Sequence, residues 1–257
     1  EEISYEQAMD EIAAKLKTVI DQYGPEGFAV STSGWNTQTT QSADRRFMNL
    51  IGAPNWISGV ALCAGNTAAV NRLTYGWFPM GDFANTNCIV LFGHNPKKHS
   101  WTPIYNMIEA ARERGAKVIV LDPRVSEQAE VADLHLSLRS GTDAAMCLGW
   151  LKVIFDEGLY DKKFVENWCT GFEALKARVD EYPLDRVSEI TGVDAALIAE
   201  AARMYATADG AIIPWTPITD MQISSTSAIR LHSILRAVTG NLAVSYTHLR
   251  AHETLPN

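Results

Sequence analysis

Two kinds of residue in this sequence could do chemistry: a cysteine flanked by glycines, and carboxylates that directly follow apolar runs. The cysteine is Cys63, which lies between Gly59 and Gly65 in a stretch without clear helical or strand periodicity. Glycines allow a backbone to approach a ligand closely, and a thiolate is a good ligand for a soft metal ion. A lone cysteine in apolar surroundings is most often a small core residue, and the residues alone favour that interpretation.

The carboxylates belong to Asp122 and Asp143. Asp122 ends the apolar run 117–121 and begins an Asp-Pro-Arg turn that includes Arg124. An acidic residue at the end of a strand can hold a ribose or a base edge, although an aspartate before proline is more often only a turn residue. Asp143 follows Gly141 at the start of a helical pattern. Its carboxylate could accept the N–H groups of a guanine, but the positive end of the helix dipole alone also explains an aspartate there.

A polar turn ends the apolar run 89–92 in the same way, with the sequence Gly-His-Asn-Pro at 93–96. Gly93 and Asn95 tolerate unusual backbone angles, and Pro96 prevents the strand from continuing. A helix over 103–114 and a second buried strand follow, so this stretch predicts a Rossmann-like crossover unit. The usual glycine fingerprint of NAD sites is absent. In an open parallel sheet, such turns meet at the carboxyl edge, where ligands bind.

The remaining patterns predict the elements that position these residues. The expected elements are a helix over 4–23, a strand over 27–31, a helix over 36–51, a glycine-containing loop and short helix over 55–76, a strand over 134–138, a helix from 143, helices through 160–207, a strand over 211–215 and a helix over 226–240. This order predicts an α/β protein with mostly parallel Rossmann-like sheets flanked by helices. We expect His232 to be a helix-face residue, because no second ligand stands at metal-binding spacing.

The composition and net charge limit the classes of protein to which this sequence can belong. The 257 residues are 47% hydrophobic and 20% charged, which is typical of a globular protein. The net charge of −8 argues against binding nucleic acid or an anionic membrane surface, and no apolar run reaches transmembrane length. The four cysteines form no Cys-x-x-Cys pair, so zinc ribbons and disulfide frameworks are not expected. A reducing, cytoplasmic location is therefore expected.

Six short sequence segments follow one another along the chain: YEQAMDEIAAKL, CAGNTA, LFGHNP, VLDPR, ADLHLSLRSGTDAAM and LRAVTGN. This ordered set resembles the molybdopterin oxidoreductase family, the dimethyl sulfoxide reductase group of molybdenum and tungsten enzymes. The resemblance covers residues 1 to about 243. Within the family, runs such as RRFMNLIGAPNW and VDEYPLDRVSEITG are most similar to the hydratase type, which adds water to an alkyne at the metal.

The resemblance implies a cofactor and a set of site residues. Family members hold molybdenum or tungsten through a bis-molybdopterin guanine dinucleotide cofactor, and Cys63 matches the side chain that ligates the metal. Trp101 and Trp215 match bulky residues that close over the metal in the hydratase type. The residues that match cofactor-binding positions are Gly93, His94, Asn95 and Pro96 in one loop, Asp122, Arg124, Gly141 and Asp143 around the guanosine, and Thr219, Met221 and Gln222 in a later loop.

The sequence also departs from the family pattern. The family's iron–sulfur cluster and the carboxylate attributed to hydration lie in an amino-terminal segment that this chain lacks, so the cluster is expected only there. The first residues already fit a helix, and the chain is therefore expected to be a fragment, inactive by itself. Ala64 and Trp35 replace aliphatic residues near the metal. The expected domains are 1–58, the first part of one α/β domain; 59–243, an inserted cofactor-binding α/β domain; and 244–257, a non-native-looking tail.

Three hypotheses about function remain open. The first hypothesis is that the chain is part of a hydratase, in which the metal acts as a Lewis acid without net redox change. The second hypothesis is that the chain is part of a redox member of the family, which moves electrons or an oxygen atom and requires an electron-transfer partner. The third is a non-catalytic nucleotide-binding module with Cys63 in its core. The first two predict a small-molecule substrate, and none predicts a nucleic-acid partner or a membrane segment.

Overall fold

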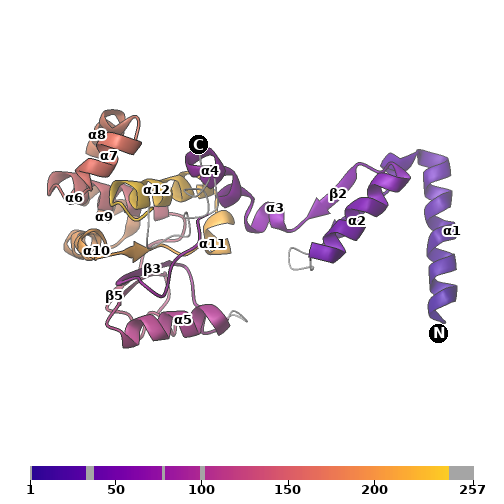
Figure 1. The fold of residues 1–257 in the computed structure, drawn as a ribbon, viewed down its shortest axis with the longest axis horizontal. Coiled ribbons are helices and arrows are strands. Elements are labelled where there is room, and N and C mark those ends of the chain that lie inside the picture. The colour runs from indigo at the N-terminus through magenta and orange to yellow at the C-terminus, as the bar shows by residue number, and fades with distance from the viewer. Residues whose placement is uncertain (1, 33–37, 77–78, 99–101, 243–257) are drawn as a thin grey trace, which may run out of the picture. The chain divides into compact units, whose positions relative to one another are not determined.

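The structure is a computed structural model of the chain, and it describes residues 2–32, 38–76, 79–98 and 102–242. The predictions for Trp35, Trp101 and the tail 244–257 therefore lie outside the described residues. The chain divides into two compact units, Glu1–Cys63 and Ala64–Asn257 (Figure 1). Within the described ranges, no helix is long and apolar enough to cross a membrane.

The first unit pairs two parallel strands beside two long helices. Helix α1 (Tyr5–Tyr23) begins after Ser4, whose hydroxyl oxygen accepts a hydrogen bond from the Gln7 N–H at 3.1 Å, as its capping pattern predicts. A short 3-10 helix, η1 (Pro25–Gly27), leads to strand β1 (Ala29–Thr32). Helix α2 (Gln38–Ile51) follows, and strand β2 (Asn55–Ser58) then pairs in parallel with β1.

The prediction of a loop over the first part of 55–76 is wrong. Residues 55–58 form β2, and Cys63 ends a short helix, α3 (Val60–Cys63), rather than lying in a loop. The strand forms because β1 offers it a hydrogen-bonding partner far away in the sequence, and a short polar segment gives no local sign of that partner. Helix α4 (Gly65–Tyr75) then opens the second unit, at the position where a short helix was predicted.

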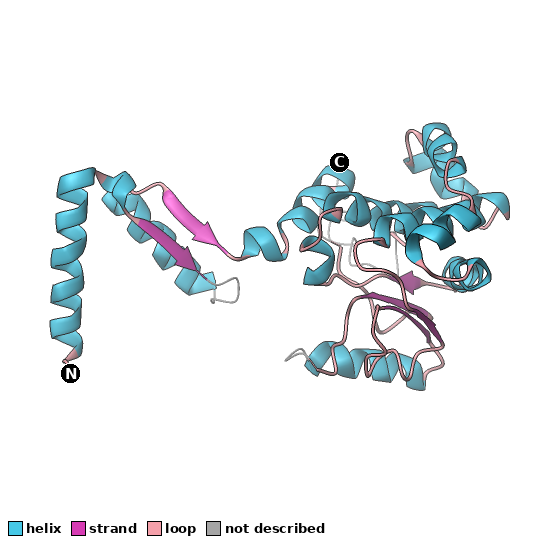
Figure 2. Cartoon of the chain, turned by 180° about the vertical axis from the view of Figure 1, so that it is seen from behind, coloured by secondary structure: helices cyan, strands magenta, loops and turns pink. Residues whose placement is uncertain are grey.

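The second unit is built on a four-stranded parallel sheet in the order β5–β4–β3–β6 (Figure 2). Its strands are β3 (Cys88–Phe92), β4 (Lys117–Leu121), β5 (Leu134–Leu136) and β6 (Ala211–Ile212). The central strand β3 is buried over its whole length, as a continuous apolar run predicts for a strand covered on both faces. The polar turns after β3 and β4 share one edge, because Phe92 pairs with Leu121.

Helices cover both faces of this sheet (Figure 1). Ile89 and Leu91 pack against helix α5 (Thr102–Glu113) on one face. Val90 and Phe92 point to the other face and join the larger core. The helices on that side are α6 (Asp143–Asp156), α7 (Lys162–Trp168), α8 (Phe172–Asp180), α9 (Leu184–Thr191), α10 (Ala195–Thr207) and α12 (Ser225–Val238), with α11 (Pro217–Asp220) beyond the end of β6. The predicted α/β architecture is confirmed.

Candidate functional site

A cavity of about 350 Å³ lies at the carboxyl edge of the sheet in the second unit. It gathers residues that follow β3 and β4, the residues before α6, and the segment around α11. Its lining consists of Gly93, Leu121, Asp122, Pro123, Arg124, Leu138, Ser140, Gly141, Asp143, Ile218, Met221 and Gln222. Most of the residues predicted to bind a cofactor therefore meet at one place, and the position matches the rule for ligand sites in parallel sheets.

Gly93 forms the turn at the end of β3. Its φ angle of +55° lies in the left-handed region that favours glycine. Its N–H donates a hydrogen bond of 2.7 Å to the carbonyl oxygen of Leu121, which holds the turn against β4. A Cβ atom at this position would stand 2.7 Å from Cγ2 of Ile218. Glycine is thus required by the backbone angle and by the close approach of α11.

Asp122 is both a turn residue and a cavity residue. The residue is only 4% exposed, and Oδ1 accepts a 2.8 Å hydrogen bond from the Arg124 N–H. The Arg124 guanidinium is largely exposed, with Nε 3.8 Å from the same oxygen. The carbonyl oxygen of Asp122 lies 2.9 Å from Nε2 of His135. These contacts fix the turn and leave the carboxylate on the cavity wall with an exposed cation beside it.

Asp143 begins α6 and also lines the cavity. Burial raises the pKa of its carboxyl group, and hydrogen bonds from its own N–H and from the Gln222 side chain partly offset that rise. Oε1 of Gln222 has no hydrogen-bond partner among the described residues. The preceding residue, Thr142, stands at the N-cap, but its hydroxyl donates to the Arg139 carbonyl oxygen at 2.6 Å instead of capping the helix. The wall therefore offers acceptor oxygens that would gain from an N–H donor.

His94, Asn95 and Pro96 are buried but do not line this cavity. Asn95 donates through Nδ2 to Oε2 of Glu127 at 2.7 Å, and Lys98 lies 3.1 Å from the other oxygen of that carboxylate. The Asn95 hydrogen bond, together with Glu127's own N–H and Lys98, lowers the pKa of Glu127 to about 2. Glu127 was not predicted from the sequence, because its partners come from a different turn of the sheet.

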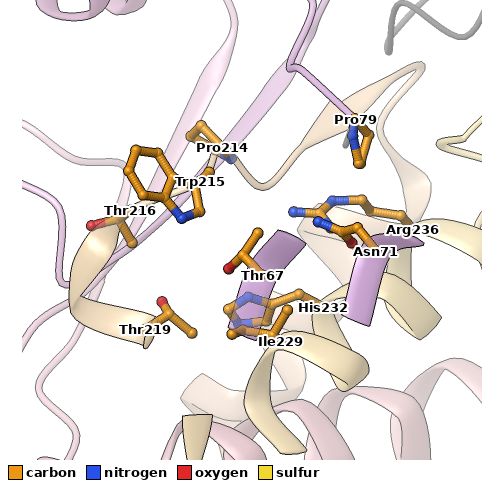
Figure 3. Close-up of a pocket in the computed structure, with 10 residues that line it drawn as sticks. All are labelled: Thr67, Asn71, Pro79, Pro214, Trp215, Thr216, Thr219, Ile229, His232 and Arg236. Carbon is orange, nitrogen blue, oxygen red and sulfur yellow. The ribbon is translucent and has the colours of Figure 1, made fainter. Parts of the chain in front are cut away.

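A second, much smaller cavity of about 20 Å³ lies between α4, α11 and α12 (Figure 3). Thr67 and Asn71 project into it from α4, and His232 and Arg236 from α12. Burial, with the charge of Arg236, lowers the pKa of His232 to about 3, so the imidazole is neutral at pH 7. Its ring contacts that of Phe92, with 4.2 Å between the centroids and a tilt of 43°, as expected of a helix-face residue. The described part of the chain has no cluster of three or more His, Cys, Asp or Glu residues that could hold a metal.

Trp215 and Thr219 line this smaller cavity, and the next residue in the sequence, Asp220, is buried. The Asp220 carboxylate accepts hydrogen bonds from Trp215 Nε1 at 3.0 Å and from both the N–H and the hydroxyl of Thr67. Sequence analysis named the loop around Asp220 but not Asp220 itself. The available signal was its isolation, since it is the only charged residue between Asp209 and Arg230.

The four cysteines differ in setting. Cys63 is partly buried at the end of α3, and its N–H donates to the Gly59 carbonyl oxygen at 3.0 Å. Cys88 and Cys147 are core residues of the second unit; burial raises the pKa of Cys88 to about 12 and also raises that of Cys147. Both thiols are therefore protonated at neutral pH and are not candidates for metal ligation.

Comparisons with known proteins bear on the whole chain. A family model described as Molybdopterin oxidoreductase matches residues 1–228. Acetylene hydratase of Syntrophotalea acetylenica is 51% identical over 269 aligned positions, which cover 100% of this chain and 37% of that protein. Formate dehydrogenase H of Escherichia coli (strain K12) is 32% identical, over 94% of this chain and 34% of that protein.

The fold gives the same result. The structure matches that of acetylene hydratase from Pelobacter acetylenicus with a TM-score of 0.87 and 53% identity, over 96% of this chain and 34% of that one. The chain thus spans about a third of the length of these relatives. The family model, the sequence relatives and the structural match agree, and the resemblance found in the sequence motifs is confirmed. The chain belongs to the molybdopterin oxidoreductase family.

Proposed function

We propose that the whole protein is a hydratase that adds water to an alkyne, and that this chain supplies part of its cofactor-binding scaffold. The observation that carries the proposal is a difference in similarity. Over nearly the same stretch, the chain is 51% identical to acetylene hydratase but 32% identical to formate dehydrogenase H. A redox member of the family would not be expected to share more with a hydratase than with a dehydrogenase.

Family membership implies a molybdopterin cofactor with a metal. We propose that it is the bis-molybdopterin guanine dinucleotide form and that the 350 Å³ cavity takes one guanosine end. The size is that of a small-ligand pocket. Guanine presents N–H donors, and the wall offers the Asp143 carboxylate and the unpartnered Oε1 of Gln222. Asp122 suits the hydroxyls of a ribose, and the exposed Arg124 suits a phosphate. The residues fit the group.

Other residues have supporting parts in this proposal. Gly93 brings backbone close to the cavity, and Asn95, anchored by Glu127, holds the His94–Pro96 turn in place. Thr219, Met221 and Gln222 carry the α11 segment to the cofactor. Cys63 ligates the metal, tungsten or molybdenum, and Trp101 and Trp215 form an apolar wall that excludes bulk water from the substrate. When bound, the metal supplies a Lewis acid that activates water or the alkyne.

The full-length protein, with its amino-terminal segment and expected iron–sulfur cluster, provides the test. We expect the reduced, metal-loaded enzyme to convert acetylene and water to acetaldehyde with no net consumption of electrons. A preparation that adds no water to an alkyne, yet reduces or oxidises a dye-linked substrate, would establish the redox alternative and its electron-transfer partner. Absence of both molybdenum and tungsten, with cofactor content unchanged by Cys63→Ala, would instead establish a non-catalytic nucleotide-binding module.

A further inference from the structure

Asp220 is a buried residue, 5% exposed, whose carboxylate accepts three hydrogen bonds: two from Thr67, far away in the sequence, and one from the nearby Trp215. Its Oδ1 accepts the N–H of Thr67 at 2.8 Å, and its Oδ2 accepts the Thr67 hydroxyl at 2.6 Å and the Trp215 indole N–H at 3.0 Å. Both carboxylate oxygens therefore accept at least one hydrogen bond. A buried carboxylate is costly unless it is bonded in this way, which marks Asp220 as a residue with a specific task.

The bond to Trp215 fixes the direction of a large side chain. A tryptophan has two side-chain torsions, and its position is defined once the backbone and the indole nitrogen are both held. Trp215 lies three residues beyond the end of β6, outside the hydrogen bonding of the sheet, and is only partly buried. Figure 3 shows the ring on one side of the small cavity and Thr67 facing it. The hydrogen bond to the Asp220 carboxylate therefore restrains the indole nitrogen.

The bonds to Thr67 fix the carboxylate in turn. Helix α4 starts at Gly65, and its N-cap residue, Ala64, makes no side-chain capping bond. Asp220 supplies the missing acceptor to the third residue of the helix, where a negative charge is also favoured by the helix dipole. Asn66 adds a 2.5 Å bond from Nδ2 to the Ser225 hydroxyl. The carboxylate is thus held by a rigid helix on one side and holds the indole on the other.

We propose that Asp220 is a positioning residue that sets the orientation of Trp215 and thereby the shape of the substrate pocket. The part concerning substrate rests on the proposed function, in which Trp215 is a pocket wall. Replacing Asp220 by asparagine leaves one acceptor oxygen and adds an N–H₂ donor. Indole N–H cannot accept a hydrogen bond, so the indole loses its fixed partner whenever the remaining oxygen bonds Thr67. An indole without this hydrogen bond can change orientation, so we expect a wider range of alkynes to enter the substrate pocket.

The first measurement does not depend on activity. The full-length protein is labelled with 5-fluorotryptophan, and the Trp215 signal is assigned in the ¹⁹F NMR spectrum with Trp215→Phe. We expect Asp220→Asn to shift or broaden that signal, while Thr67→Val, which removes one donor to Asp220 but leaves the indole bond, leaves it in place. Asp220→Glu is the second variant: it keeps the charge but displaces the oxygens, and we expect the signal to move again.

The second measurement is selectivity. We expect Asp220→Asn to change the ratio of kcat/KM for a larger alkyne over acetylene by about three- to tenfold, the scale of one lost hydrogen bond. The change should vanish in a Trp215→Phe background, where no indole N–H remains. An unchanged Trp215 signal in both Asp220 variants overturns the proposal and leaves Asp220 as a helix cap. A moved signal in a protein without hydratase activity retains the positioning role and rejects only the proposed reaction.

Discussion

Gly93 and Ile218 approach each other so closely that a Cβ atom on Gly93 would lie 2.7 Å from Cγ2 of Ile218. We expect Gly93→Ala to destabilise the protein by about 1–3 kcal/mol, from the left-handed φ angle and from the contact together. Thermal unfolding measures the loss. Gly158→Ala is the matched control, because its φ is +67° and no atom lies within 4 Å of the added Cβ. If both variants lose the same stability, the approach of Ile218 has no energetic weight.

Asp143 is expected to select guanine. Asp143→Asn replaces one acceptor oxygen by a donor that opposes the N–H groups of the base, so cofactor retention should fall about tenfold or more. Nucleotide released by acid from the purified full-length protein, measured against metal content, checks this. The control is Asp156→Asn at the other end of α6, where the carboxylate is exposed and pairs with Lys152. Equal guanine content in the two variants would remove Asp143 from the site.

We expect Glu127 to make the stability of the turn after β3 depend on pH. Its pKa is about 2 in the folded protein against an ordinary value of about 4.5, owing first to the Asn95 hydrogen bond. A lowered pKa of a carboxyl group gives stability that is present above pH 4.5 and is lost as the pH falls towards 2. The difference in melting temperature between the protein and Glu127→Gln should therefore shrink over that range. A difference that stays constant from pH 5 to pH 2 contradicts the ion-pair arrangement.

His232 should add a second acid-sensitive step at higher pH. The folded protein holds its pKa at about 3, below the ordinary 6.5, so the unfolded chain takes up a proton that the folded chain excludes. Its contribution to stability is complete above pH 6.5 and falls at lower pH, by up to about 1.4 kcal/mol per pH unit. Urea unfolding at pH 7 and pH 5 should show a smaller pH effect for His232→Gln. An identical pH effect in the variant would mean that the imidazole is charged in the fold.

The sequence was most informative where local chemistry decides the structure. The apolar runs at 88–92 and 117–121 became buried parallel strands, and the polar residues after them met at one cavity. Those outcomes follow from strand periodicity and from the turn chemistry of Gly93 and Asp122. Roles that the motifs imply for Cys63 and Trp101, the domain limits 1–58 and 59–243, and the cytoplasmic location stay predictions.

The features that the sequence hid depend on partners far along the chain. Strand β2 pairs with β1, Glu127 accepts a hydrogen bond from Asn95, and Asp220 accepts hydrogen bonds from Thr67. In each case the partner lies in another element of the fold, so the local sequence pattern does not identify it. Asp220 is the case with a local signal, because it is the only charged residue between Asp209 and Arg230.

The cap of α4 also has a consequence in time. Thr67 and Asp220 are 153 positions apart, and a ribosome adds about 5–20 residues per second. The first turn of α4 is thus synthesised roughly 8–30 s before its acceptor. During that interval the Thr67 N–H has no access to the carboxylate that accepts its hydrogen bond in the folded chain. The whole β3–β4 crossover is therefore synthesised before the acceptor that caps α4.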